Sequence, residues 1–197
     1  MRREYDFSKG TRGKHVGSKL RIIGDHRVRN GSNGADTSRA GNTLIGTAGE
    51  YYVCAELCRL GYLALLTPKN NPLFDVVVTN VNGTKSASIQ VKTRSIRNTQ
   101  GWKIGKPRDA GETPGDPFVV LVNMHADQSP DFYVYRYSEF VSRVTEIFEN
   151  YITKPKRSGA PRKDPGFRCF DEKNFTDADR ARMNDWEPII RALEVDG

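Results

Sequence analysis

Four residues of the chain have side chains of the kinds that metal-assisted hydrolytic sites use: Glu50, Asp75, Gln90 and Lys92. Two carboxylates and an amide oxygen near one point suit Mg²⁺ or Mn²⁺, which prefer oxygen ligands and keep waters for substrate phosphates. A cation held there polarises a phosphoryl oxygen and lowers the pKa of its bound water. An adjacent ammonium group stabilises the charge that builds on the phosphorus oxygens. If folding gathers these groups, they outline a site for phosphodiester hydrolysis, with Mg²⁺ (or Mn²⁺) as the cofactor.

Glu50 lies in a segment with the pattern of an amphipathic helix. Thr47 can cap a helix over about residues 48–60, and Gly61 can end it. Apolar residues recur at helical spacing from Val53 onward, and Glu50 lies at the end of that stripe rather than opposite it. We therefore expect this helix to pack on a sheet and to carry Glu50 toward it.

The other three residues lie on two predicted strands, 74–79 and 86–93, joined by a turn. Alternate residues of a strand share a face, so Gln90 and Lys92 point the same way. A hairpin of the two strands can bring Asp75 to that pair. Each residue alone has a plainer explanation: a Glu that favours the helix dipole, an Asp in a turn, and a solvated strand face.

The rest of the chain predicts further strands and helices around these elements. Strands are expected at 62–67, 118–123 and 132–137, of which 118–123 is almost wholly apolar and so central. Ser138 can cap a helix from Glu139 to about Tyr151, and Pro188 interrupts a last helix over 177–193. The fold class is therefore α/β, a mixed β-sheet flanked by helices.

The charge is unevenly distributed along the chain. Ten of the 31 Lys and Arg residues, but four of the 24 Asp and Glu residues, lie within residues 1–45. That segment is rich in Gly and Ser, so we expect a flexible basic N-terminal arm, either merely solvated or following phosphates. Residues 46–197 form one domain, with a core over about 46–150 and a basic loop and helix over 153–197.

The motifs around the four residues resemble the PD-(D/E)XK nuclease superfamily. The matching residues are Gly46-Thr47-Ala48-Gly49-Glu50, then Phe74-Asp75, then Ile89-Gln90-Val91-Lys92-Thr93. The resemblance covers about residues 46–150 and implies a restriction-endonuclease-like core, as in restriction enzymes, Holliday-junction resolvases and some homing endonucleases.

The resemblance also implies a role for each matching residue. Asp75 is the central metal ligand, Gln90 takes the place of the second acidic ligand, and the Val91 carbonyl is a further ligand. Lys92 is the catalytic lysine, and Glu50 is the acid on the helix. The sequence departs from the pattern at Phe74, where proline is usual, and at Gln90, where an acid is usual. A neutral ligand predicts weaker metal binding.

The composition favours a polyanionic partner. The formal net charge is +7 and the pI about 9.4, a balance typical of nucleic-acid-binding proteins. Further basic or polar residues follow the motif or occupy later loops, where they either contact phosphates or form a solvated surface. They are Thr93, Arg94, Arg97, Lys103, Lys106, Arg108, Lys154, Lys156 and Arg157.

The sequence thus predicts a divalent-metal-dependent DNA endonuclease, with RNA still open as a substrate. Two alternatives remain: a weak or inactive DNA-binding module on the same fold, and a protein-interaction module that meets an acidic partner. A homodimer is a further expectation, because one such site cuts one strand and a two-fold pair cuts both. No signal peptide, transmembrane run or phosphate-binding loop is readable, so we expect a cytoplasmic protein with no membrane partner and no nucleotide cofactor.

Overall fold

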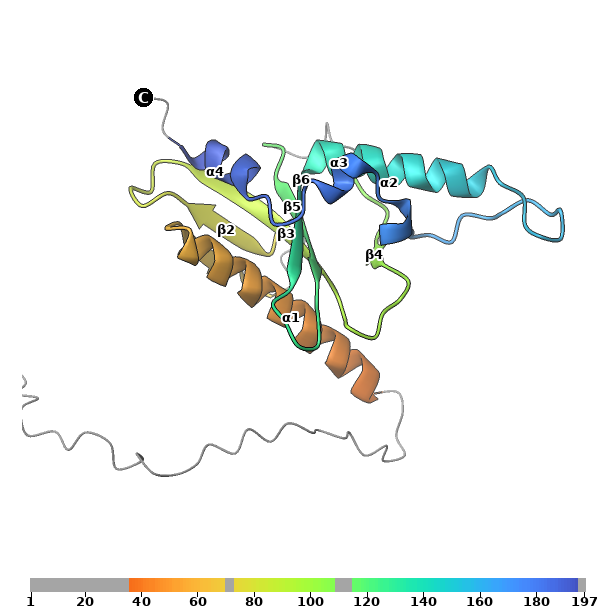
Figure 1. Ribbon diagram of the computed structural model, residues 1–197, viewed down its shortest axis with the longest axis horizontal. Coiled ribbons are helices and arrows are strands. Elements are labelled where there is room, and N and C mark those ends of the chain that lie inside the picture. Colours follow the sequence, from red (N-terminus) through yellow and green to blue (C-terminus); the bar gives the residue numbers. More distant parts are fainter. Residues whose placement is uncertain (1–35, 70–72, 109–114, 195–197) are drawn as a thin grey trace, which may run out of the picture. The chain divides into compact units, whose positions relative to one another are not determined.

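The computed structural model describes residues 36–69, 73–108 and 115–194, with only the backbone of 36–40 and 42. Its centre is a five-stranded mixed sheet in the order β1-β2-β3-β5-β6. The strands are β1 Leu63–Leu66, β2 Val76–Thr79, β3 Ser86–Arg94, β5 Phe118–Asn123 and β6 Asp131–Arg136. The helices are α1 Asp36–Arg59, α2 Tyr137–Ile152, α3 Asp177–Arg180 and α4 Glu187–Leu193. The α/β class and the mixed sheet flanked by helices are confirmed (Figure 1).

Strand β3 is the middle strand of the sheet and has neighbours of both directions. It pairs antiparallel with β2 and parallel with β5, while β1–β2 and β5–β6 are antiparallel. In the parallel pair Gln90 lies opposite Val119 and Lys92 opposite Leu121. Because paired residues share a face of a sheet, Gln90 and Lys92 lie on the same face as these two buried residues.

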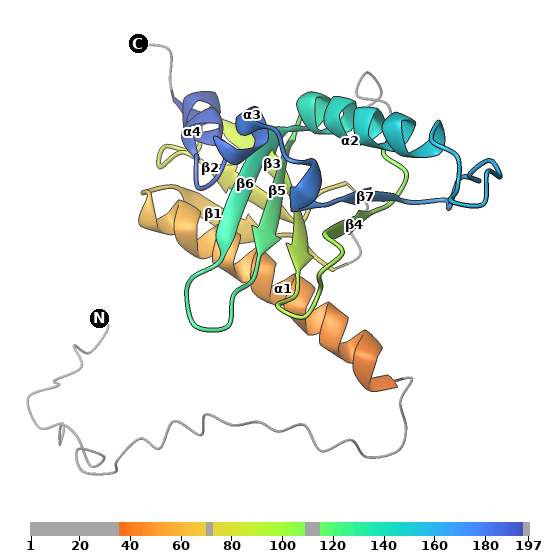
Figure 2. The same ribbon diagram turned by 45° about the vertical axis from the view of Figure 1, so that its right-hand side comes forward.

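The two faces of the sheet are covered by different elements, as Figure 2 shows. Helices α1 and α4 cover one face, where aliphatic side chains such as Val53, Leu57 and Ile189 are fully buried. Helix α2 covers the other face together with aromatic residues, among them Trp102 and Phe140. This second face is the one that Gln90 and Lys92 share.

Helix α1 begins at Asp36, well before the predicted start near residue 48, so Thr47 is inside the helix and is not its cap. Once a helix is nucleated, adding residues to its end costs little, and this explains the extension over a stretch with no apolar period. The end at Arg59 agrees with the prediction, since Gly61 follows with φ of +93°. Of the predicted flexible arm at 1–45, residues 36–45 belong to α1 instead, and residues 1–35 lie outside the described residues.

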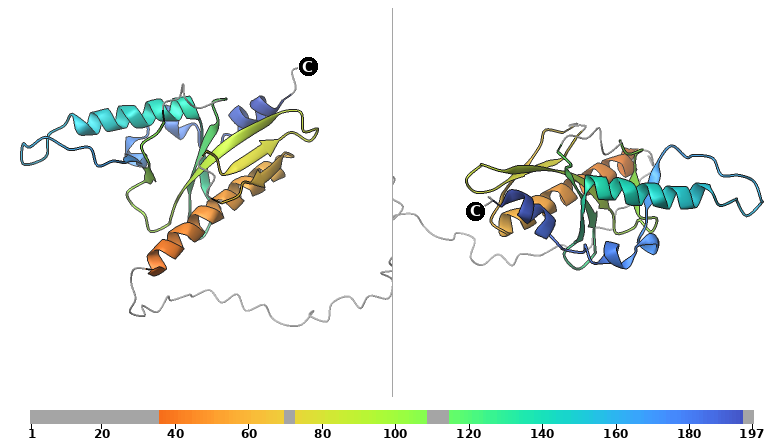
Figure 3. Two further views of the ribbon diagram at one scale, coloured as in Figure 1. Left: turned by 180° about the vertical axis from the view of Figure 1, so that it is seen from behind. Right: turned by 90° about the horizontal axis from the view of Figure 1, so that it is seen from above.

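A small second sheet was not predicted. Strand β4 (Trp102–Ile104) pairs antiparallel with β7 (Arg168–Phe170). A short 3₁₀ helix, η3 (Glu172–Asn174), follows. The chain between α2 and β7 extends away from the central sheet and returns to pair with β4, as the views in Figure 3 show.

Two helix predictions need correction. Ser138 does not cap α2, which begins one residue earlier; its backbone N–H and hydroxyl instead donate to the Asp116 carboxylate, at 2.8 and 2.9 Å. The single C-terminal helix is divided into α3 and α4, with Asn184 between them at φ of +57°. Pro188 lies in the first turn of α4, where its missing N–H is not needed. Among the described helices none has the length and apolar character to cross a membrane.

Candidate active site

Asp75 lies directly before β2 and is fixed against β3 by hydrogen bonds. Its carboxylate Oδ2 accepts from the Val91 N–H at 2.7 Å, and its own N–H donates to the Ile89 carbonyl at 2.9 Å. On the other side, the Thr67 N–H donates to the Asp75 carbonyl at 2.9 Å, and the Thr67 hydroxyl donates to the Phe74 carbonyl at 2.9 Å. The carboxylate is therefore held at the point in β3 between Gln90 and Lys92.

Glu50 reaches the same region because α1 crosses β3 at very short range. A Cβ atom on Gly49 would lie 2.0 Å from the Thr93 hydroxyl, so only glycine permits this approach. Burial raises the pKa of Glu50, and the nearby charge of Asp75 raises it further, whereas Lys69 and Lys92 lower it. Glu50 is therefore close enough to Asp75 and Lys92 for their charges to act on its carboxyl group.

The two carboxylates line one pocket of about 270 Å³. Its other walls come from α1 and from the segment after β1, and it is lined by Thr43, Gly46, Thr47, Glu50, Thr67, Pro68, Lys69 and Asp75. Neither Glu50 nor Asp75 forms an ion pair with any described residue. Two like charges thus share a partly buried pocket without a paired cation.

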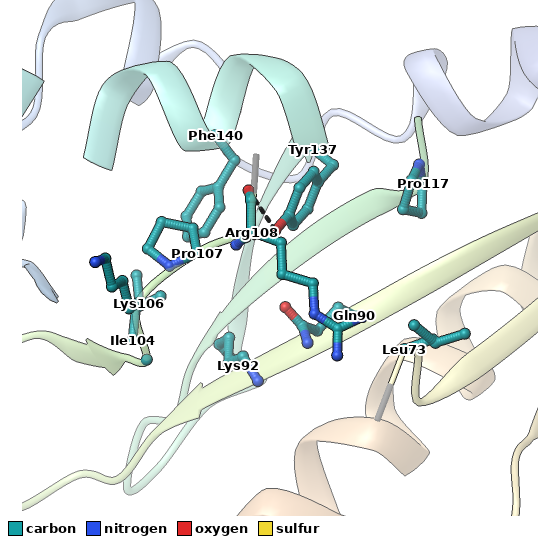
Figure 4. Close-up of a pocket in the computed structure, with 11 residues that line it drawn as sticks. Leu73, Gln90, Lys92, Ile104, Lys106, Pro107, Arg108, Pro117, Tyr137 and Phe140 are labelled. Atoms are coloured by element: carbon teal, nitrogen blue, oxygen red, sulfur yellow. Dashed lines mark hydrogen bonds between the residues drawn. The ribbon is translucent and has the colours of Figure 1, made fainter. Parts of the chain in front are cut away.

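Gln90 and Lys92 line a different pocket, of about 210 Å³, on the face of the sheet that α2 covers (Figure 4). Its opposite wall is formed by the segment around Arg108 and by the start of α2. The Asp75–Val91 hydrogen bond links the two pockets, because Val91 separates Gln90 from Lys92 in the chain. The structure thus brings Glu50 and Asp75 together in one pocket, and Gln90 and Lys92 together in its neighbour.

The donor atoms in this region fit a hard divalent cation. The two carboxylates of the first pocket are oxygen donors of the type that Mg²⁺ and Mn²⁺ prefer, whereas the Gln90 carboxamide lines the neighbouring pocket. The charge of Asp75 raises the pKa of Glu50, and a bound cation would offset that repulsion. In the part of the chain that the structure describes, no three His, Cys, Asp or Glu side chains cluster as a metal site. Among the described residues, Glu50 and Asp75 are the acids that line this pocket.

Lys69 and Thr67 are the members of the site that the sequence analysis missed. Lys69 lines the carboxylate pocket and lowers the pKa of Glu50, and Thr67 anchors the backbone of Asp75. Both follow β1 closely, and Pro68 between them ends the strand. They follow β1, which lies two strands away from the Lys92 strand β3 in the sheet, so no local sequence pattern predicts that they belong to the site.

Two residues that were predicted to contact phosphates, Thr93 and Arg94, are partly buried within the fold. The Thr93 hydroxyl is buried beneath α1, beside Gly49. The Arg94 guanidinium donates to Asn123 Oδ1 at 2.9 and 2.6 Å and to Glu172 Oε1 at 3.0 Å, and it lies 4.7 Å from the centroid of the Trp102 ring. Burial beneath α1 withdraws Thr93, and these hydrogen bonds withdraw Arg94, from the surface.

The remaining basic residues of the prediction are exposed and divide into three groups. Lys106 and Arg108 line the pocket of Gln90 and Lys92, so they lie beside the candidate site. Lys103 and Arg97 line another shallow pocket, and Lys103 lies over the Phe167 ring. The three residues Lys154, Lys156 and Arg157 lie in the extension beyond α2, away from the sheet (Figure 3).

Comparisons with known proteins give a likeness in structure but no family or curated match. No protein-family model matches the sequence, and no curated protein matches it. Among solved structures, that of a bacterial homing endonuclease is similar, with a TM-score of 0.48 and 14% sequence identity. The similar region covers 76% of this chain and 93% of the endonuclease.

Proposed function

We propose that the protein is a divalent-metal-dependent DNA endonuclease with a restriction-endonuclease-like core. One observation carries the proposal: Glu50 and Asp75 share a pocket without a paired cation, and Lys92 is close enough to act on the same charge. A titratable group in a pocket with a raised pKa, as Glu50 has, is typical of functional sites. A purely structural pair of acids would be expected to form ion pairs, whereas Lys69 lines the same pocket without an ion pair to either acid.

The residues divide the work of phosphodiester hydrolysis between them. Asp75 and Glu50 would supply oxygen ligands from their shared pocket and Gln90 one from the neighbouring pocket, and Mg²⁺ or Mn²⁺ held there would polarise the phosphate and lower the pKa of the attacking water. Lys92 orients that water and stabilises the negative charge of the transition state. Asp75 acts from a fixed position. Its carboxylate accepts a hydrogen bond from the Val91 N–H, and the Thr67 hydroxyl holds the adjacent backbone by donating to the Phe74 carbonyl.

Gln90 sets the strength of the cofactor site. Its neutral carboxamide leaves the site one negative charge short of an acidic ligand set, so metal binding is weaker. Higher metal concentrations, or Mn²⁺ in place of Mg²⁺, are then needed for full activity. The exposed Lys106 and Arg108 give salt-dependent affinity for the DNA backbone beside the site.

The test is cleavage of supercoiled plasmid and of short DNA duplexes with Mg²⁺ or Mn²⁺. Asp75→Ala and Lys92→Ala should each lower the cleavage rate roughly 100- to 1,000-fold, as expected when a group that stabilises transition-state charge is removed. Asp127→Ala and Lys163→Ala are the matched controls, since both residues are exposed and lie outside the two pockets, and they should retain activity.

Two outcomes would count against the proposal. Wild-type protein that leaves every substrate intact with both metals, yet binds DNA in a salt-sensitive way that Lys92→Ala does not change, is a binding module. Failure to retard any nucleic acid at low salt would favour the protein-interaction alternative. Binding of Mn²⁺, followed by the paramagnetic resonance of the free ion, separates loss of metal from loss of chemistry.

A further inference from the structure

The pocket of Gln90 and Lys92 has a chemistry of its own that metal binding does not explain. Its polar side chains are the carboxamide of Gln90, the cations Lys92, Lys106 and Arg108, and the hydroxyl of Tyr137. Its lining contains no Asp or Glu among the described residues. The remaining walls are mostly apolar and come from Leu73, Ile104, Pro107, Pro117 and Phe140. A cationic end and an apolar wall in one small pocket fit a ligand with an anionic group joined to a flat or apolar body.

Arg108 and Lys92 are the cations that converge. In Figure 4 the Arg108 side chain extends from its loop toward the Gln90 carboxamide, and Lys92 emerges from the next outward position of β3. Lys106 points away from the pair in the same view. Neither Arg108 nor Lys92 forms an ion pair with a residue that the structure describes. Both charges are therefore available to an anion.

The loop that carries Arg108 is held at this position by Tyr137. The Tyr137 hydroxyl accepts from the Arg108 N–H at 3.1 Å and donates to the Arg108 carbonyl at 3.1 Å. Tyr137 is the first residue of α2, so the loop is tied to a regular element. An arginine on a fixed backbone loses less freedom when it binds phosphate, and its planar donors fit two phosphate oxygens.

The neutral residue at position 90 keeps these cations free. A glutamate here would lie in the same pocket as the guanidinium and the ammonium and would compete with an anion for both. The carboxamide does not, and it offers one donor and one acceptor group to the body of a ligand. The substitution that weakens the metal site therefore favours an anion in this pocket.

We propose that this pocket binds one phosphate of a nucleic-acid strand together with its attached nucleoside. Arg108 and Lys92 contact the phosphate, and the nucleoside lies against Phe140, Ile104 and Pro107. The volume of about 210 Å³ is below the range of about 300–1,000 Å³ typical of pockets for whole drug-sized ligands, so the pocket has room for no more than one nucleotide unit. The inference rests on the proposed function, since it assigns a substrate subsite beside the same lysine.

The experiment measures binding of 3′-labelled single strands by fluorescence anisotropy in EDTA, so that cleavage plays no part. Arg108→Ala should weaken binding at least about tenfold, the loss expected for charge-assisted hydrogen bonds. It should also lower the salt dependence by about one phosphate contact. Arg59→Ala is the matched control, because Arg59 is exposed and pairs with Glu56 on α1, at the other face of the sheet.

A comparison of two strands identifies the ligand, and a variant at Gln90 tests the role of its neutral side chain. Tighter binding of a strand with a 5′-phosphate than of its 5′-hydroxyl twin assigns the pocket to a terminal phosphate. Equal binding of the two, with the Arg108→Ala loss intact, assigns it to an internal phosphodiester. Gln90→Glu should weaken binding in EDTA toward the level of Arg108→Ala, while a further Arg108→Ala change in that background has little effect.

The inference fails if Arg108→Ala and Arg59→Ala bind every strand equally well, or if Gln90→Glu binds as tightly as wild type in EDTA. Because these measurements exclude metal, they stand apart from the nuclease proposal. A protein that cleaves DNA but shows no Arg108 effect retains the proposed function and loses the subsite. A protein that shows the Arg108 effect but never cleaves retains the subsite on an inactive enzyme.

Discussion

Two groups of partly buried charges in this molecule are arranged in opposite ways. Around Asp179, which is 1% exposed, every charge has a partner. The carboxylate accepts from Arg143 Nη2 at 2.8 Å, from the Thr176 N–H at 2.8 Å and from the Tyr135 hydroxyl at 3.1 Å. Burial alone would raise the pKa of Asp179, but the hydrogen bonds from Arg143 and Thr176 hold it below its usual value.

Glu50 and Asp75 have the reverse arrangement, and burial together with the charge of Asp75 raises the pKa of Glu50. A fully satisfied polar network rigidifies a fold, whereas like charges held together lower its stability. Such a pair persists where a ligand that offsets the repulsion contributes to function. The contrast therefore separates a cluster that stabilises the chain from one that is suited to bind a cation.

Asp179→Asn should give the largest loss of stability, because it breaks the charged partnership at its most buried point. We expect the free energy of unfolding at pH 7 to fall by about 3–5 kcal/mol, as for other buried pairs that lose one partner. A carboxyl group with a lowered pKa stabilises the fold above its unfolded pKa of about 4, so the difference from wild type should shrink as pH falls below that value. Urea unfolding at several pH values measures both. Cleavage by the folded variant should be near normal.

Arg94→Ala tests the comparison within one strand face, since Arg94 and Lys92 are alternate residues of β3. Arg94 is bonded to Asn123 and Glu172, so we expect its removal to cost about 2 kcal/mol of stability, the range for hydrogen bonds with charged groups. Lys92→Ala should leave stability almost unchanged and lower the cleavage rate roughly 100- to 1,000-fold. Thermal and urea unfolding of the two variants, beside their cleavage rates, would contradict the assignment if the pattern were reversed.

Gly49→Ala tests the helix–strand contact that brings Glu50 to Asp75. The added Cβ would meet the Thr93 hydroxyl, and overpacking of this kind costs about 1–3 kcal/mol. Gly46→Ala is the control, because a Cβ at that position in the same helix meets nothing within 4 Å, and alanine should stabilise the helix by up to about 1 kcal/mol. Opposite signs in urea unfolding are expected, and two equal effects would exclude the steric explanation.

Glu50→Gln should give the smallest change in the free energy of unfolding, and it should stabilise the protein rather than destabilise it. Removing a like charge should stabilise the protein by a few tenths to about 1 kcal/mol at pH 7, the scale of partly exposed charge interactions. A carboxyl group with a raised pKa lowers stability only once it ionises, so the difference should vanish below about pH 4 and grow as pH rises. Mn²⁺ should narrow the difference at pH 7, because wild type offers two carboxylates to the cation and the variant only that of Asp75. A destabilised Glu50→Gln variant would contradict the repulsion.

The strands could be predicted because their signals are local. Alternation and a turn ending in Gly83, whose N–H donates to the Asn80 carbonyl at 3.0 Å, are enough to pair 76–79 with 86–89. The same local register is enough to place Asp75 opposite the segment of Gln90 and Lys92. The helix start at Asp36 and the β4–β7 pairing were missed because neither has a local signal. The helix extends by elongation of turns that are already formed, and the β4–β7 pair joins segments far apart in the sequence.

The site was less predictable than the strands for the same reason. That Glu50 approaches Asp75 depends on Gly49 meeting Thr93, which no periodicity in either segment shows. Arg94 matched the pattern of a phosphate-binding residue, but its partners Asn123 and Glu172 come from later elements that withdraw it from solvent. A basic residue next to a motif therefore says little about its exposure until the rest of the chain is in place.

The order of the strands also sets an order of assembly. Strands β1, β2 and β3 are neighbours both in sequence and in the sheet, so residues 50–92 fold through short loops, whereas the parallel β3–β5 pair must close a long one. Contacts between near neighbours form sooner than contacts across long loops. We therefore expect Glu50 and Asp75 to meet early in refolding, and Asp179 to bond with Arg143 late. In pulse-labelled hydrogen exchange the Val91 amide should gain protection before the Thr176 amide, and simultaneous protection would refute this sequence of events.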